Sequence, residues 1–161
     1  MGNLEQEFES TYHQYIDMIY RLCFSFLKNK EDTEDAVQSV FVKYIKKGKK
    51  FENENHEKAW FIVTSSNICK DMLRQSWRKR NISVETFDFI SDTEDAVDHD
   101  LYMAIMDLPD KYKTVIYFYY YEGYKTKEIA KILHKPSSTI RNYLTEARRH
   151  LEKILGGTYN G

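Results

Sequence analysis

The stretch YKTKEIAKILHKPSSTIRNYLTEARRHLEKIL, residues 124–155, has two apolar stripes of helical period on either side of a proline. Pro136 cannot continue a preceding helix, so one helix is expected over 126–133 and a second over 138–155. The small side chain of Ala130 allows the two helices to cross closely. The stretch therefore predicts a helix-turn-helix.

The second predicted helix combines an apolar face with a polar one. The apolar face is Ile140, Leu144, Ala147 and Leu151, and the outward residues are Ser138, Thr139, Arg141, Asn142, Thr145 and Arg148. Arginine and asparagine can pair with purine edges in DNA, and hydroxyl groups near a helix N-terminus suit phosphate oxygens. Ser137 or Ser138 is expected to cap this helix. The pattern favours DNA binding over an ordinary helical hairpin with a solvated face.

The formal net charge of -1 conceals an uneven distribution. Residues 1–80 hold 14 basic and 12 acidic side chains, residues 81–107 hold no basic and 8 acidic ones, and residues 108–161 hold 10 basic and 5 acidic ones. A polyanion meets the local charge of the surface that it approaches, not the total. The basic C-terminal third therefore suits a nucleic-acid partner. The acidic middle segment offsets its charge in the total but does not change the local charge of that surface.

The rest of the chain also reads as helical. Apolar residues at spacings of three and four predict helices over 8–29, 32–47 and 56–80, with Asp32 or Thr33 capping the second. A further helix is expected over 98–107 and another over 110–121, where the segment TVIYFYYY has the composition of a strand but has no strand partner in sight.

These elements predict an all-α fold of two small helical domains. The domains are expected over 1–80 and 101–161, joined by an acidic linker over 81–100, which has no sustained period.

Several classes of protein are disfavoured by the sequence. The five histidines show no ligand spacing with the two cysteines or with paired acids, and there is no glycine-rich phosphate loop. An enzyme, a metal site and a bound cofactor are therefore not expected. Cys23 and Cys69 are expected to be reduced core residues of a cytoplasmic protein. No apolar run approaches the roughly 20 residues that span a bilayer, and the acidic N-terminus has no signal-peptide core.

The order and spacing of three motifs resemble sigma factors of the sigma-70 superfamily, in particular the small extracytoplasmic-function (ECF) type. The segment LPDKYKTVIYFYYYEGYKTKEIAKILHKPSSTIRNYLTEAR, residues 108–148, is similar to the family's helix-turn-helix domain. EDTEDAVQSVFVKYIK, residues 31–46, is similar to the helix that docks on core RNA polymerase. KAWFIVTSSNICKDMLR, residues 58–74, is similar to the helix of promoter recognition and melting. The family usually has glycine where His134 stands.

The resemblance implies three sets of contacts. The upstream promoter element would meet the last helix, at base edges through Arg141, Asn142 and Thr145 and at phosphates through Ser137, Thr139 and Arg148, with Ser138 as a further DNA contact. The downstream element would meet the 48–56 loop and the third helix, with DNA contacts at Asn55, Asn67, Lys70, Arg74 and Arg78. Core RNA polymerase would meet Asp32, Asp35, Gln38 and Ser39.

The predicted function is that of an alternative sigma factor, which binds core RNA polymerase and promoter DNA and directs initiation. An anti-sigma factor is a further partner that the resemblance allows. Two other readings stay open at this stage. One is a stand-alone helix-turn-helix regulator that never touches polymerase, and the other is a sigma-like adaptor that holds polymerase without reading DNA.

Overall fold

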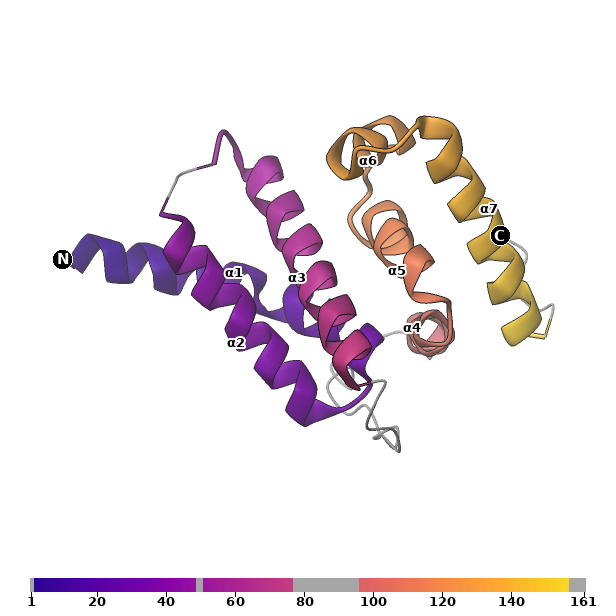
Figure 1. Cartoon of the computed structure of the whole chain (residues 1–161), viewed down its shortest axis with the longest axis horizontal. Coiled ribbons are helices and arrows are strands. Elements are labelled where there is room, and N and C mark those ends of the chain that lie inside the picture. Colours follow the sequence, from indigo (N-terminus) through magenta and orange to yellow (C-terminus); the bar gives the residue numbers. More distant parts are fainter. Residues whose placement is uncertain (1, 49–50, 77–95, 157–161) are drawn as a thin grey trace. The chain divides into compact units, whose positions relative to one another are not determined.

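The computed structural model describes residues 2–48, 51–76 and 96–156 (Figure 1). The helices in these ranges are α1 (Gly2–Leu27), α2 (Lys30–Lys47), α3 (Glu54–Ser76), α4 (Ala96–Met106), α5 (Asp110–Ile116), the π-helix η2 (Tyr117–Tyr121), α6 (Thr126–Leu133) and α7 (Ser137–Ile154). The chain divides into two compact units, Met1–Glu85 and Thr86–Gly161. The all-α prediction with two helical domains is confirmed.

The predicted acidic linker lies mostly outside the described residues. Its last five residues, 96–100, are the first five of α4, which begins two residues before the expected start at Asp98. The fold of the first unit therefore rests on α1, α2 and α3, and that of the second on α4 to α7.

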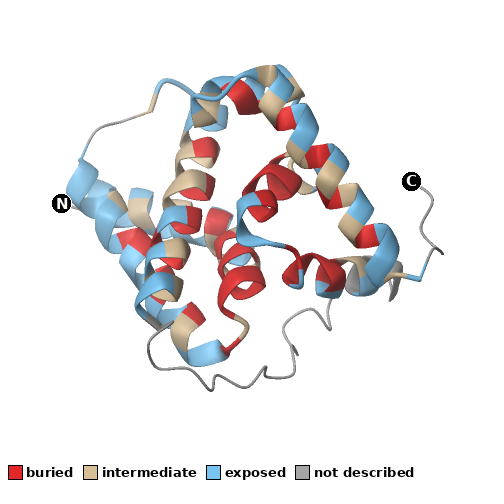
Figure 2. Cartoon of the chain, turned by 45° about the vertical axis from the view of Figure 1, so that its right-hand side comes forward, coloured by how far each residue is buried: buried red, intermediate tan, exposed pale blue. Residues whose placement is uncertain are grey.

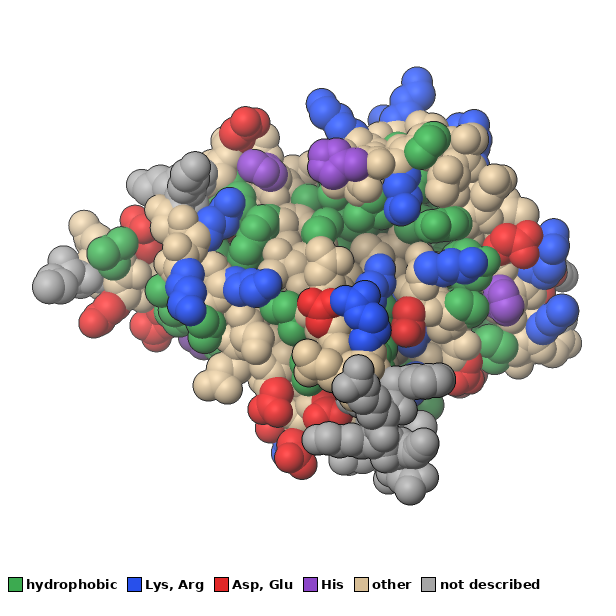
Figure 3. Space-filling view, in the orientation of Figure 1, with side chains coloured by type: hydrophobic (Ala, Val, Ile, Leu, Met, Phe, Trp, Pro, Cys, Tyr) green, Lys and Arg blue, Asp and Glu red, His purple; other side chains and the backbone are tan. Residues whose placement is uncertain are grey.

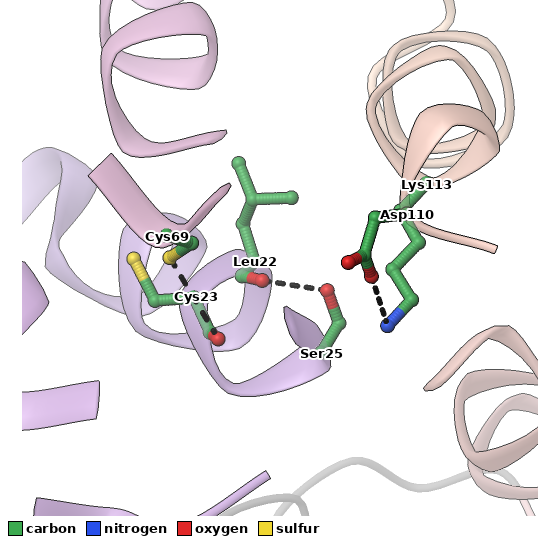
Figure 4. A network of polar contacts seen from close by, with 6 residues as sticks. All are labelled: Leu22, Cys23, Ser25, Cys69, Asp110 and Lys113. Atoms are coloured by element: carbon green, nitrogen blue, oxygen red, sulfur yellow. Dashed lines mark hydrogen bonds and ion pairs between the residues drawn. The ribbon is translucent and has the colours of Figure 1, made fainter. Parts of the chain in front are cut away.

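The first unit is a three-helix cluster in which each helix packs against the other two. Figure 2 shows the buried residues on the facing sides of these helices. They are large and apolar, and include Ile19, Leu22, Phe26, Val40, Phe61 and Ile62. Cys23 and Cys69 are both buried and free, and the Cys69 Sγ lies 4.0 Å from the Cys23 carbonyl oxygen (Figure 4). The two cysteines are core residues, as predicted.

Two residues, Lys28 and Asn29, join α1 to α2. Lys28 ends α1 in the left-handed region, with φ at 63°, and Asn29 then caps α2. The Asn29 Oδ1 accepts the backbone N–H of Asp32 at 2.8 Å, and its amide donates to the Asp32 Oδ2 at 2.9 Å. The predicted cap at Asp32 or Thr33 was wrong, because α2 already begins at Lys30. Thr33 is instead buried, and its hydroxyl donates to the Asn29 carbonyl.

The second unit is organised around α7, which packs against α4, α5 and α6. Ile140, Leu144, Ala147 and Leu151 are all buried, as the stripe predicted. On α5, Lys113 Nζ lies 3.3 Å from the Asp110 carboxylate, three residues earlier on the helix (Figure 4). This spacing is one helical turn, so the pair stabilises the start of α5.

The ambiguous segment TVIYFYYY is helical, but not uniformly so. Its first residues complete α5, and Tyr117–Tyr121 form the π-helix η2. Tyr117 and Phe118 are buried, so the segment contributes large aromatic side chains to the core of the second unit. A π-helix is rare and often lies at a functional site. Sequence composition does not distinguish it from an α-helix.

The turn between α6 and α7 is held by backbone geometry. His134 adopts the left-handed conformation (φ 56°, ψ 45°), and its N–H donates to the α6 carbonyls of Ala130 and Lys131. Pro136, not a serine, is the N-cap of α7, and it provides no side-chain hydrogen bond. The predicted cap at Ser137 or Ser138 was wrong, because α7 begins one residue earlier than expected.

Candidate nucleic-acid interface

The outward face of α7 carries the polar residues that the sequence predicts for DNA binding. Ser138, Arg141, Asn142 and Thr145 are exposed, and Ser137, Thr139 and Arg148 are half-buried. Lys and Arg side chains project from the outer edge of α6 and α7 (Figure 3). Arg141 and Arg148 are seven residues apart, so they lie on the same flank of the helix, about two turns from each other.

The N-termini of α6 and α7 differ in the charge of their first turns. At α6 the Glu128 Oε1 accepts the backbone N–H of Lys125 at 2.8 Å, which satisfies an amide that precedes the helix. At α7 the N-cap is a proline with no side-chain hydrogen bond. The first turn of α7 also contains no acidic residue. Neither helix has a side-chain cap on its first-turn amides, but Glu128 counters the partial positive charge at α6, so the start of α7 suits an external phosphate better.

Arg148 has intramolecular partners that the sequence did not reveal. Its Nε donates to the Tyr120 hydroxyl at 2.8 Å, and its guanidinium lies 5.9 Å and 5.8 Å from the ring centroids of Tyr119 and Tyr120. The hydrogen bond to Tyr120 is the main reason that the pKa of Arg148 is raised. These contacts hold the charged side chain of Arg148 against η2.

On α3, three of the predicted DNA contacts share one face. Asn67, Lys70 and Arg74 follow the spacing i, i+3 and i+7, which aligns side chains along a helix. Asn67 and Arg74 are exposed, and Lys70 is half-buried. Arg74 forms an ion pair with Asp71, and because both side chains are exposed this pair contributes little to stability. Asn55 is exposed in the first turn of α3, and Arg78 lies outside the described residues.

An aromatic cluster joins the end of α2 to the start of α3. The Phe51 ring stacks on Tyr44 with centroids 6.2 Å apart and lies 5.8 Å from Trp60. The Lys47 ammonium lies 5.2 Å from the Phe51 centroid and 5.9 Å from that of Trp60. His56 meets the edge of Phe51. Aromatic faces beside a cation are the chemistry that receives an unstacked base.

Glu57 ties this cluster to the core of the first unit. Its carboxylate accepts hydrogen bonds from the hydroxyls of Tyr15 at 3.2 Å and Tyr44 at 3.3 Å. Burial is the main cause that raises the pKa of Tyr44, and the nearby Glu57 charge adds to it. One acidic side chain on α3 thus fixes a tyrosine from each of α1 and α2.

A groove of about 590 Å³ runs between α1 and α2. Its lining is mostly apolar with a polar edge: Phe8, Tyr12, Ile16, Tyr20, Glu34, Val37, Gln38, Phe41, Val42 and Ile45. Tyr12 is 36% exposed and Ile45 is 60% exposed. Both belong to the apolar stripes of their helices, but a periodic pattern shows which face is apolar and not whether another element covers it.

The predicted polymerase contacts lie along this groove or close to it. Gln38 lines the groove, and Asp35 and Ser39 are exposed on α2. Asp32 is half-buried and takes part in the cap of α2 through Asn29. The sequence pattern did not indicate that the apolar residues of the groove form part of a binding surface. In the structure, the exposed Val42 and Ile45 extend the surface that Gln38 lines.

Two features are absent from the part of the chain that the structure describes. No helix there is long and apolar enough to cross a membrane. No group of three or more His, Cys, Asp or Glu side chains in those ranges is arranged to hold a metal ion.

Comparison with known families matches both units separately. The model for sigma-70 region 2 matches residues 11–79, and the model for sigma-70 region 4 matches residues 98–151. The first match contains the α1–α2 groove except Phe8, together with the aromatic cluster and the exposed face of α3. The second contains η2 and the helix-turn-helix.

Individual relatives agree with these matches. The RNA polymerase sigma factor SigV of Bacillus subtilis is 33% identical over 130 residues, covering 80% of this chain and 78% of SigV. The ECF RNA polymerase sigma factor SigX of the same organism is 27% identical over 170 residues, covering 94% and 87%. A solved structure of the sigma factor RpoE in complex with the anti-sigma factor NepR from Bartonella quintana shares the fold, with a TM-score of 0.73 at 18% identity over 96% of this chain and 99% of that one. The chain therefore belongs to the sigma-70 family of RNA polymerase sigma factors, and within it to the ECF type.

Proposed function

We propose that the two units divide the work of an alternative sigma factor between them. The chain binds core RNA polymerase and directs it to promoters, and the family is one of initiation factors, not enzymes. The observation that carries this assignment is the presence of both region 2 and region 4, each with an intact polar surface on a folded helical unit. A regulator that binds DNA alone would need only the second unit.

The second unit reads the upstream promoter element through α7. Arg141, Asn142 and Thr145 are exposed along the helix, where they can reach base edges in the major groove. Ser137, Ser138 and Thr139 form the first turn of α7, which has no side-chain cap and suits a phosphate. Base contacts would give sequence preference, and phosphate contacts would fix the register of the helix on the duplex.

The first unit binds the downstream element and favours its opening. Separated strands are stabilised when an unstacked base finds an aromatic surface and the backbone finds cations. Phe51, His56 and Trp60 supply aromatic faces at the start of α3. Asn67, Lys70 and Arg74 continue from there along one face of the same helix.

Core polymerase docks on α2 and the groove beside it. The groove offers apolar side chains that are already exposed, such as Val42 and Ile45, and a polar edge at Glu34 and Gln38. Apolar contact with a polar rim is the usual composition of a protein interface. Asp35 and Ser39 extend this polar rim along α2. An anti-sigma factor is proposed as a competing partner, because a solved relative of the same fold is held by one.

Reconstituted transcription tests this function. The full chain with core polymerase should give transcripts from one start site, and core alone should not. Arg141→Ala and Asn142→Ala should each weaken promoter binding by about 1–3 kcal/mol and relax preference at one base position. Lys153→Ala, which removes a charge from the last turn of α7, is the matched control and should change little.

Two results would contradict the assignment. Equally abundant transcripts from core alone would remove the need for this chain. Strong binding of promoter duplex without core polymerase would favour the stand-alone regulator. A promoter reader must bind DNA with an affinity that falls steeply as the salt concentration rises. A polymerase-binding adaptor would show no such DNA binding.

A further inference from the structure

A tyrosine pair on the π-helix holds one arginine of the recognition helix. The Tyr119 and Tyr120 rings meet edge to face, with centroids 5.1 Å apart and planes at 79°. The Arg148 guanidinium lies within 6 Å of both ring centroids, and its Nε donates to the Tyr120 hydroxyl at 2.8 Å. Tyr120 is 28 residues earlier in the chain, so this is a tertiary contact between η2 and α7.

The hydrogen bond to Tyr120 is made by the Nε–H of the guanidinium. An arginine side chain has five N–H donors in a fixed plane, and the Nε–H is one of them. The two terminal amino groups form the other edge of the plane, which matches two oxygens of a phosphate. Fixing the Nε side against a phenol therefore sets the direction in which this second edge points.

Arg148 lies on the side of α7 where its terminal amino groups can reach DNA. Arg148 lies two helical turns from Arg141 on the same flank, and the proposed function places the promoter on that side. The opposite flank is held differently, since Tyr112 of α5 contacts Tyr143 and His150 there. The recognition helix is thus supported by aromatic side chains on both sides, and those on the η2 side hold an arginine of α7 itself.

We propose that Tyr119 and Tyr120 are positioning residues for promoter binding, which hold the Arg148 guanidinium so that its terminal amino groups meet a backbone phosphate of the upstream element. This inference rests on the proposed function. Tyr120 supplies the hydrogen bond that orients the guanidinium, and Tyr119 places a second aromatic ring beside it. Because a phosphate is the target, the contact should raise affinity for promoter DNA without adding preference for any base.

A double-mutant cycle in the reconstituted holoenzyme tests the inference. Tyr120→Phe keeps the ring and removes only the hydroxyl, and Arg148→Ala removes the cation. Loss of one phosphate contact in Arg148→Ala should make the slope of log affinity against log salt shallower by about 0.9. Tyr120→Phe should lower promoter affinity by about 5-fold, the usual size of one hydrogen bond, and should make the slope shallower in the same sense. In the Arg148→Ala background, Tyr120→Phe should cost nothing further.

Tyr143→Phe is the matched control, because it removes a phenol from the opposite flank of α7 and should leave both affinity and slope unchanged. An unchanged salt slope in Arg148→Ala would overturn the inference while leaving promoter recognition intact. An equal cost of Tyr120→Phe with and without Arg148 would also overturn it, since the tyrosine would then act by another route. A wild-type holoenzyme with no promoter preference would instead refute the proposed function, and the inference with it.

Discussion

Replacing His134 by glycine should stabilise the second unit. His134 ends α6 with φ at 56° and ψ at 45°, which is the left-handed region. A side chain with a Cβ is disfavoured there by about 1–2 kcal/mol, and only glycine is free of this cost. His134 is exposed, so the substitution removes no core contact.

The expected gain is smaller than the conformational cost itself. Glycine loses more backbone freedom on folding than other residues, by about 0.5–1 kcal/mol. The difference leaves a net stabilisation of about 0.5–1 kcal/mol. Since about 1.4 kcal/mol is a factor of ten, the opening equilibrium of the second unit should fall by about 2- to 5-fold.

Hydrogen exchange followed by mass spectrometry can locate this effect. Peptides from α6 and α7 should exchange about 2- to 5-fold more slowly in His134→Gly, whereas peptides from α1, α2 and α3 should not change. His134→Ala retains a Cβ and should give no gain. Lys28→Gly, at φ 63°, should protect the first unit instead, and Gly48→Ala, at φ 64°, should loosen it. Equal exchange in His134→Gly and His134→Ala would refute the reasoning, because backbone strain would then not be the cause.

Three further predictions follow from burial, titration and capping. Ile140→Ala, at a fully buried position of α7, should destabilise the second unit by about 2–5 kcal/mol, measured by urea unfolding followed by circular dichroism. Burial, helped by the charges of Glu122 and Glu128, raises the pKa of Tyr124 to about 12 from 10.0, so its neutral form contributes stability that is present below pH 10 and lost between pH 10 and pH 12. Urea midpoints of wild type and Tyr124→Phe at pH 9 and pH 11 should show the smaller fall in the variant, and parallel falls would contradict it. Asn29→Ala should cost the first unit about 0.5–2 kcal/mol, seen as faster exchange in α2, because it removes the cap on the Asp32 amide.

Helical periodicity predicted most of the fold. The stripe of α7 and the proline before it were sufficient for the helix-turn-helix, because four apolar residues on one face have no other way to be buried. The segment TVIYFYYY shows the limit of propensity, since its tyrosines favour a strand in isolation but are helical among helical neighbours. The π-helix η2 within this segment depends on tertiary packing, and no pattern in the sequence indicates it.

The details of the candidate sites were less predictable. Both expected caps were displaced by one to four residues, because Asn29 and Pro136 compete with several plausible neighbours for the same role. Arg148 was expected on the outward face, and its contact with Tyr120 could not be inferred, since the two residues are separated by a helix and a turn. Ile45 is exposed because no other described element covers that face of α2, and a local sequence pattern cannot indicate this.

The aromatic cluster around Trp60 has an optical consequence. The sequence contains two tryptophans, Trp60 and Trp77, and both belong to the region 2 match. Indole emission excited at long wavelength therefore reports on the first unit alone, while the tyrosine-rich second unit stays dark. Lys47 and Phe51 lie beside the Trp60 ring. Under the proposed function, the wavelength or intensity of Trp60 emission should change when a base binds at the start of α3. Under the proposed function, the tryptophan emission of the unmodified protein should therefore follow DNA opening at the first unit, separately from recognition of the upstream element by the second unit.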